Sequence, residues 1–547
     1  MAIASFQLLP PTGNGVVDAL TNGTHWLLDN TRTVQWAIAD APPGDWKWSV
    51  AGAESLRLAA SAILADFAEV ANIRFEYTGT YGDVRSAMAD IAITATTRPF
   101  AFSLPDGAYA RSFFPNEIWA DTEIQRLYGS TTSYPDAAGD VVLNFASTEI
   151  LNSSFRPGST GHFALMQELA HAVGLKHPQD NSGNPSRPTF QQLGFSLADT
   201  QLLTVMSNET ATDIARLLQQ YKIPADVGYP SSLMPLDVIA LQALYGPNMA
   251  TRAGDTLYEL FNDDAIETWW DAGGADVLSA ARSAFGWNIV AVNLEFATLV
   301  AAQPSDWGST TGKYYFNVET LEGSAHDDTI VGHALENTLS GLAGDDLLSG
   351  GGGNDRIDGG SGMDFGWWLG ARRSFQITID DTGVRVRDLV GREGTDWLTR
   401  VERLVFADRQ VAVDVGPGEA GLEAALLLRT LLGPEGLRDP GLNGLVLALL
   451  DVGVSFETLM GSALQSPLFL AAAGGASDTQ FIRQVYRSVV GIEPSSADLS
   501  YFNGLLGSGT FTRLDLALLA ATSDFNVESA EITGVVTGGL DYVPYTG

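Results

Sequence analysis

A nine-residue repeat constrains this 547-residue chain more than any other feature. From residue 323 the units read GSAHDDTIV, GHALENTLS, GLAGDDLLS, GGGGNDRID and a degenerate GGSGMDFGW. The sixth position is Asp or Asn throughout, and the eighth is apolar in the first four units before it fails at Gly366. A fixed register of this kind predicts coils stacked as a parallel β-roll, with glycines in the turns and the eighth positions in the core.

The same repeat predicts calcium binding. Hard Ca²⁺ prefers oxygen ligands, and aspartates beside turn carbonyls supply them. The first two units carry His326 and Leu335 where glycine is usual, so we expect the strongest binding between residues 341 and 364. The expected ligand positions are Gly344, Asp346, Gly353, Asp355, Gly362 and Asp364.

Charge and composition exclude several other roles. Acidic residues outnumber basic ones 65 to 30, a formal charge of −35 that repels nucleic acid and anionic lipid surfaces. The Leu-rich stretches 422–432 and 445–452 are too short to span a bilayer, so we expect no membrane insertion. Cysteine is absent, which excludes disulfides, cysteine zinc sites and thiol nucleophiles. The first residues lack a basic segment and contain Pro10 and Pro11, unlike a cleaved N-terminal signal peptide.

Residues 1–248 alternate strand and helix patterns, which predicts an α/β domain. Short β-type runs and helical spacings follow one another along this part of the chain. The expected strands are 33–38, 73–77, 90–94 and 141–145, and the expected helices are 53–72, 160–173 and 235–245.

The remaining chain predicts three further domains. Residues 249–365 should form the calcium-binding roll, and residues 366–417, with a hairpin pattern over 375–386, a β-rich module that caps it. Pro417 and its flanking glycines indicate a linker. Residues 418–547 predict an all-α module, with one apolar stripe at Phe481, Ile482, Val485, Tyr486 and Val489.

One short motif points to metal chemistry. Gln167 and His171 are four residues apart, so they lie on one face of the expected helix, and Gly174 lets the chain turn and bring His177 to the same place. Glu168 would stand beside the ion and deprotonate a bound water. His162 lies about 140° from Gln167 around the helix, so we expect it on the surface. The histidines at 25, 326 and 333 are interpreted as bystanders.

This stretch resembles the metzincin motif HExxHxxGxxH, and residues 30–365 resemble the serralysins, calcium-dependent zinc proteases that bacteria export by type I secretion. Met206, in Thr204–Ser207, resembles the family's Met-turn. Residues 236–256 resemble the segment that joins the protease to the roll, and residues 270–276 resemble its next calcium-binding turn. The resemblance implies zinc at Gln167, His171 and His177, Glu168 as catalytic base, and further calcium positions at Arg252, Gly254, Thr256, Asp271, Gly273 and Asp276.

Two positions depart from the family pattern. Gln167 stands where the family has its first histidine ligand, and an amide oxygen is a poorer zinc donor than imidazole. Asn208 stands where the family has a tyrosine that can ligate zinc or support the transition state. Of these two roles, only transition-state support is expected of Asn208. We therefore expect either a secreted zinc endopeptidase with a weakened metal site or an inactive pseudo-protease that acts as an extracellular binding protein.

The resemblance also sets expectations for export and partners. It implies an extracellular or cell-surface protein that uses the type I secretion machinery and, if active, cleaves a protein or peptide substrate. Residues 478–526 resemble a helical module that accompanies such repeats in exported bacterial proteins. We expect the C-terminal module to contain a secretion signal and to serve a cell-surface partner.

Overall fold

The computed structural model describes residues 3–4, 10–98, 109–115, 117, 120–128, 137–147, 150, 155–181, 186–194, 199–208, 229–260, 266–284, 287–292, 297–302, 312–391 and 393–545. The chain divides into two compact units. The first comprises Met1–Leu278 with Trp287–Val318, and the second comprises Ser279–Gly286 with Glu319–Gly547.

A five-stranded mixed sheet forms the framework of the first unit, in the order β4-β3-β5-β7-β6. Four strands are parallel and match the expected runs, whereas β6 is an antiparallel edge strand that the sequence did not predict. The bounds are β3 (Thr33–Ala39), β4 (Arg74–Tyr81), β5 (Ile91–Thr96), β6 (Ala110–Ser112) and β7 (Val141–Asn144).

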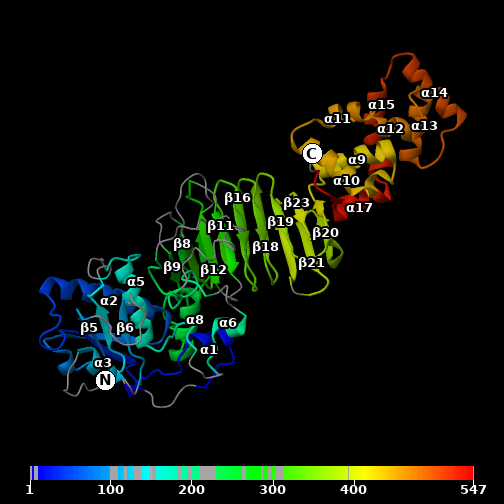
Figure 1. Cartoon of the computed structure of the whole chain (residues 1–547). Helices are drawn as coiled ribbons and strands as arrows, with labels where there is room; N and C mark the ends of the chain where they lie inside the picture. The colour runs from blue at the N-terminus through cyan, green and yellow to red at the C-terminus, as the bar shows by residue number, and fades with distance from the viewer. Residues whose placement is uncertain are drawn as a thin grey trace. The chain divides into compact units, whose positions relative to one another are not determined.

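Helices pack against this sheet and against one another (Figure 1). The long helix α2 (Val50–Val70) begins at the N-cap Ser49 and buries Leu56, Ile63 and Phe67 against β4 and α5 (Thr160–Ala172). Helix α8 (Pro235–Tyr245) begins at a proline, a favoured first helical residue. The shorter helices are α1 (Gly15–Leu20), η1 (Val84–Ser86), α3 (Ala120–Tyr128) and α6 (Phe190–Leu193).

Smaller strands complete the first unit. β11 (Trp287–Val292), β12 (Ala297–Ala302) and β13 (Gly312–Phe316) are antiparallel, and β13 pairs in parallel with β9 (Ile266–Trp269). Two further pieces, β1 (Ile3–Ala4) and β2 (Trp26–Leu27), form a separate antiparallel pair. The remaining short strands are β8 (Leu257–Glu259) and β10 (Val277–Ser279).

The second unit contains the predicted parallel β-roll. One sheet contains β14 (Thr320–Glu322), β16 (Thr338–Ala343) and β18 (Arg356–Ser361), and the other contains β15 (Thr329–Val331), β17 (Leu347–Ser349) and β19 (Phe365–Trp367). Each strand pairs with the strand 18 residues further along, for example Thr338 with Arg356, so two repeat units make one coil. The apolar eighth positions are buried between the sheets, at Ile330, Leu339, Leu348 and Ile357.

Both sheets continue past the repeat. β22 (Thr395–Thr399) adds in parallel to β18, and β23 (Arg403–Val405) adds in parallel to β19. The expected hairpin is present as β20 (Phe375–Asp380) and β21 (Gly383–Asp388), and β21 pairs with β22. A short 3-10 turn, η4 (Arg372–Ser374), precedes it.

A helical module follows, and two paired strands of one sheet flank it in the sequence. β24 (Gln410–Ala412) precedes the helices, and β25 (Leu540–Tyr542) follows them and pairs with β24. Buried Arg403 forms ion pairs with Asp414 at 2.5 Å and with Asp451 at 2.6 Å, which join this sheet to the first helices. The helices are α9 (Ala420–Leu432), η5 (Gly436–Arg438), α10 (Pro440–Asp451), α11 (Phe456–Ala463), α12 (Pro467–Ala473), α13 (Asp478–Val490), α14 (Ser496–Gly507), α15 (Arg513–Ala521), α16 (Asp524–Val527) and α17 (Ala530–Gly538). Within the described ranges, every helix is too short or too polar to cross a membrane.

Candidate metal centre

A tight turn after α5 brings two histidines of the motif face to face. The helix ends at Ala172, and Gly174 follows with φ +107°, a left-handed conformation that favours glycine. A Cβ at this position would lie 2.4 Å from the carbonyl oxygen of Thr24, so a side chain would also collide. The chain then reverses, and Nε2 of His177 lies 3.1 Å from Nε2 of His171.

Backbone carbonyls fix the orientation of both imidazoles. His171 Nδ1 lies 2.8 Å from the carbonyl oxygen of Leu175, and His177 Nδ1 lies 2.6 Å from that of Met206. Because a carbonyl can only accept, each neutral ring holds its proton on Nδ1 and presents a lone pair on Nε2. Two lone pairs at this separation repel unless a cation lies between them, so the donor set fits a metal ion. Burial, and then the nearby His177, hold the pKa of His171 well below its usual value.

The other two motif residues lie beside the imidazoles. Gln167 donates a hydrogen bond from Nε2 to the carbonyl oxygen of Val205 at 3.0 Å, which leaves Oε1 as the amide's acceptor. Glu168 is buried, and this burial raises its pKa against the opposing effects of Ser112, His177 and Arg111, in that order.

The edge strand β6 and the turn after it line one side of the candidate metal centre. Ser112 on β6 lies near Glu168, and the ring of Phe114 meets that of His171 edge-on, with centroids 5.4 Å apart. Arg111 pairs with Glu117 at 3.2 Å and with Glu123 at 3.0 Å. The sequence pattern does not reveal this strand, because it is only three residues long.

Asp237 holds the turn that carries Met206, a role that was not predicted from the sequence. Its buried carboxylate accepts from the hydroxyl of Thr204 at 2.5 Å, from the backbone N–H of Val205 at 2.7 Å and from that of Met234 at 3.0 Å. Burial raises the pKa of Asp237 to about 7 against these hydrogen bonds. The available signal was an aspartate two residues after Pro235 in a largely apolar helix.

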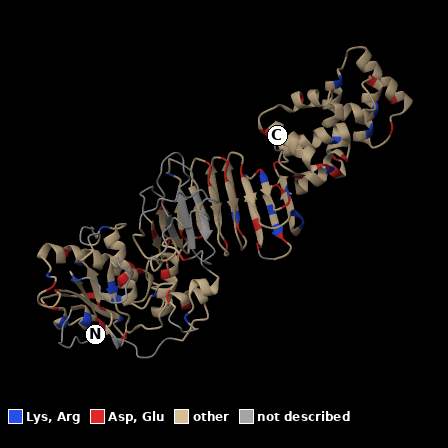
Figure 2. Ribbon diagram, viewed as in Figure 1, with Lys and Arg blue, Asp and Glu red and all other residues tan. Residues whose placement is uncertain are grey.

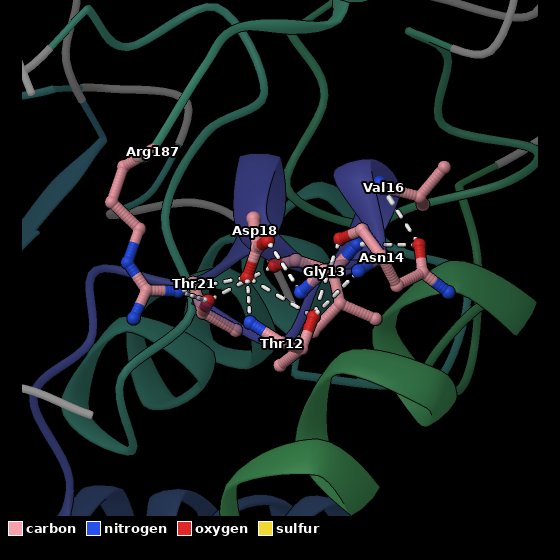
Figure 3. Close-up of polar contacts among 8 residues, drawn as sticks. Thr12, Gly13, Asn14, Val16, Asp18, Thr21 and Arg187 are labelled. Atoms are coloured by element: carbon pink, nitrogen blue, oxygen red, sulfur yellow. Dashed lines mark hydrogen bonds and ion pairs between the residues drawn. The ribbon is translucent and has the colours of Figure 1, made fainter. Parts of the chain in front are cut away.

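A second anchor fixes the segment that follows His177 (Figure 3). Arg187 donates to the hydroxyl of Thr21 at 2.6 Å and lies 3.4 Å from Oδ1 of Asp18. That carboxylate also accepts from the backbone N–H of Thr12 at 2.7 Å. The backbone N–H of Lys176 donates to Leu20 O at 2.8 Å, so α1 is tied to both sides of His177.

The structure describes two further residues that were assigned from the sequence, His162 and Asn208. His162 is buried rather than on the surface, because its Nε2 lies 3.0 Å from Ser231 O and the segment around Tyr229 stacks on the adjacent Phe163. The surface prediction was therefore wrong. Asn208 lies exposed two residues after Met206, and the 20 residues from 209 to 228 lie outside the described part of the chain.

The described residues contain no group of three or more His, Cys, Asp or Glu that could hold a metal ion. A metal at His171 and His177 would therefore need Gln167 or another oxygen donor to complete its ligands. Calcium in the roll would likewise depend on backbone carbonyls as well as aspartates.

A ladder of aspartates runs along the roll. Oδ1 of Asp346 accepts from the backbone N–H of Asp328 at 2.7 Å, and Oδ1 of Asp364 accepts from that of Asp346 at 2.9 Å. Oδ1 of Asp355 accepts in the same way from Asn337 at 2.7 Å. The three predicted glycines lie in the adjoining turns with positive φ, at Gly344, Gly353 and Gly362.

The candidate calcium sites differ in whether the second carboxylate oxygen of the ladder aspartate already accepts a hydrogen bond. Among the described residues, no donor reaches the buried Oδ2 of Asp346, Asp355 or Asp364. In the first two units, by contrast, Asp328 Oδ2 accepts from the backbone of Ser324 at 2.6 Å, and Asn337 Oδ1 accepts from that of His333 at 2.8 Å. The free oxygens fit a cation, and they lie within the stretch where the sequence predicts the strongest binding.

Two turns of the first unit bring the other predicted calcium positions together. Asp276 Oδ1 accepts from the backbone of Thr256 at 2.8 Å, and Asp271 accepts from that of Gly273 at 2.9 Å. The carbonyl of Gly254 accepts from Thr256 Oγ1 at 2.9 Å. The guanidinium of Arg252 pairs with Glu69 at 2.8 Å, so its carbonyl is the group left to contact a cation.

Comparison with known proteins gives matches to two family models and to several curated relatives. Residues 332–365 match the RTX calcium-binding nonapeptide repeat, and residues 460–530 match a domain of unknown function, DUF4214. Metalloprotease AprA of Pseudomonas entomophila is 28% identical over 40% of this chain and 41% of its own length. Serralysin of Photorhabdus laumondii is 26% identical over 44% of this chain and 47% of its own length, and Serralysin C of Dickeya chrysanthemi is 29% identical over 30% and 33%.

Each alignment spans less than half the length of the relative concerned. Residues 332–365 also match the family model of the repeat. The chain is therefore a distant relative of the serralysin metalloproteases over about 40% of its length, and it carries RTX calcium-binding repeats.

Proposed function

We propose that this protein is a secreted, calcium-stabilised, serralysin-like zinc endopeptidase with a weakened metal site. The observation that carries the proposal is the 3.1 Å approach of the two Nε2 atoms of His171 and His177, each with its proton held on the opposite nitrogen. Gln167 replaces an imidazole with an amide, which lowers metal affinity and with it the activity.

Each residue of the candidate metal centre would have its own role in peptide hydrolysis. His171, His177 and Gln167 would hold zinc, which polarises a peptide carbonyl and activates water when bound. Glu168 accepts the proton from the attacking water at its carboxylate and returns it to the leaving amine. The short strand β6 is last in its sheet, beside Glu168, where an extended peptide substrate would add as a further strand. Asn208 lacks the tyrosine hydroxyl and gives little support to the transition state.

Calcium and export form the second part of the proposal. Repeats that stay unfolded at low calcium suit passage through the type I secretion machinery, and extracellular calcium then folds the roll. The free Oδ2 atoms of Asp346, Asp355 and Asp364 support this mechanism. The helical module around residues 460–530 would then serve a cell-surface partner.

A specific observation also favours a second function, that of an inactive binding protein built on the same scaffold. Gln167 is engaged with Val205, and Asn208 departs from the family pattern at a second position. Loss of both the imidazole and the tyrosine removes two groups that such proteases use.

Hydrolysis of casein by the zinc-loaded full chain separates the two functions. We expect slow cleavage that Glu168→Gln abolishes and that Gln167→His increases together with zinc affinity. The double variant Gln167→His with Asn208→Tyr should be faster still. If this double variant binds zinc and remains inert, the protease proposal fails and the binding protein is favoured.

A further inference from the structure

The outer face of the roll carries an exposed tryptophan between two arginines. The strand registers place Thr338, Arg356, Trp397 and Arg385 in one row across β16, β18, β22 and β21. Their sequence neighbours Leu339, Ile357, Leu398 and Val384 point into the core, so the row faces outward. Trp397 is 43% exposed, which is unusual for so large an apolar side chain.

Unpaired positive charge surrounds this tryptophan. The guanidinium of Arg385 lies 5.5 Å from the centroid of the Trp397 ring, and Arg387 follows on the same face of β21. In the described part of the chain, no carboxylate lies within ion-pair distance of Arg356, Arg385 or Arg387. Figure 2 shows basic segments on these strands, although the chain has 65 acidic residues against 30 basic ones. Three guanidinium groups on one face, none of them in an ion pair within the described ranges, therefore suit an anion.

A shallow depression of about 380 Å³ lies along the same row. Its polar and aromatic lining comes from Thr338, Arg356, Asp358, Trp397 and Thr399. Asp358 forms an ion pair with Arg400, so its charge is compensated. The lining thus combines one indole face, hydroxyl groups and a free guanidinium on a flat sheet.

We propose that this row binds an anionic polysaccharide, with one sugar ring on Trp397 and its carboxylate or sulfate on Arg356 and Arg385. A pyranose has an apolar C–H face for the indole and hydroxyls for Thr338, Thr399 and Asp358. Nucleic acid has no pyranose ring to lay an apolar C–H face on the indole, and binding of oligo(dT) is the outcome that would favour it. The proposed polysaccharide site is independent of the metal centre. It would attach the secreted protein to an extracellular matrix.

Binding to oligosaccharides by calorimetry tests the proposal with the full, calcium-loaded chain. The probes are hyaluronan oligosaccharides for carboxylates, heparin oligosaccharides for sulfates, dextran as the neutral control and oligo(dT) for nucleic acid. We expect binding to at least one anionic sugar and none to dextran. Whichever of the two binds more tightly identifies the charged group.

Two independent variants locate the site. Trp397→Ala and the double change Arg356→Gln with Arg385→Gln should each weaken binding about tenfold or more. The matched controls Tyr501→Ala and Arg438→Gln, exposed residues of the helical module, should leave it unchanged. The double variant changes two exposed side chains and leaves the Trp397 ring in place, so it remains informative if Trp397→Ala disturbs folding. Equal binding by wild type and the double variant, no binding to either anionic sugar, or binding to oligo(dT) alone would overturn the proposal.

Discussion

The backbone N–H of Asp355 donates to Oδ1 of Asp396 at 3.1 Å, across 41 positions of sequence. This hydrogen bond repeats the one from Asp346 to Asp364, which spans only 18 positions. The stretch Gly394–Thr399 therefore supplies part of a further repeat unit, with Asp396 in the sixth position and Leu398 in the eighth. The roll extends beyond its recognisable repeats because a hairpin is inserted between successive coils.

The aspartate ladder predicts an unusual pH dependence when calcium is removed. Burial raises the pKa of Asp346 to about 7 and that of Asp355 to about 8, from 3.8 in a free side chain. Between these values the folded roll binds more protons than the unfolded chain, so its free energy of unfolding falls as pH rises. Circular dichroism of the full chain in chelator should therefore show a smaller folded fraction of the roll at about pH 8 than at about pH 5. Calcium should reverse this order, because it binds the deprotonated form. The opposite trend in chelator would contradict the assignment.

Calcium stabilisation should depend on the free Oδ2 atoms. In Asp355→Asn, one oxygen ligand becomes an amide, and the rise in melting temperature produced by calcium should shrink clearly. The matched change Asp328→Asn should have a much smaller effect, because Ser324 already occupies the oxygen concerned. Scanning calorimetry with and without calcium measures both. Equal losses in the two variants would show that the free oxygens do not bind the ion.

Gly174→Ala should disrupt the turn that brings His177 back to His171. Both Gly174 and Gly194 have positive φ, but only at Gly174 would a Cβ meet a backbone oxygen, at 2.4 Å. We expect Gly194→Ala to cost about 1 kcal/mol, from backbone strain alone, and Gly174→Ala to cost about 3 kcal/mol or more. Chemical denaturation of both variants tests this difference. Similar losses would mean that the Thr24 contact is not limiting.

Asp237→Asn should loosen the support of Met206. An amide has a single acceptor oxygen, whereas Asp237 uses both oxygens for the backbone of Val205 and Met234 and the hydroxyl of Thr204. We expect a loss of about 2–3 kcal/mol in unfolding free energy and weaker zinc binding. The control Asp439→Asn should be nearly neutral, because one oxygen of that helix cap accepts both of its hydrogen bonds. An unchanged stability in Asp237→Asn would contradict the proposed support.

The sequence predicts those features that depend on local patterns. The nine-residue register gives the roll, and the spacing of His171, Gly174 and His177 gives the two imidazoles that the structure brings together. The helix Pro235–Tyr245 has the expected bounds because a proline begins it and a glycine follows it. The assignments of zinc, calcium and activity remain predictions.

Features that depend on distant partners could not be read in the same way. Asp237 supports Met206 from 31 positions away, and Asp396 continues a ladder whose spacing has changed from 18 to 41. His162 is buried by residues near Ser231, which helical geometry alone does not reveal. In each case the missing information is a tertiary hydrogen bond rather than a propensity.

The most direct test of the account is zinc K-edge X-ray absorption on the full chain, saturated with calcium and then loaded with zinc. A zinc centre at His171 and His177 predicts imidazole scattering from two histidines, with ligands at about 2.0–2.2 Å. The double variant His171→Ala with His177→Ala should lose that signal. A zinc spectrum without imidazole scattering, or one that the double variant leaves unchanged, would contradict a metal centre at His171 and His177.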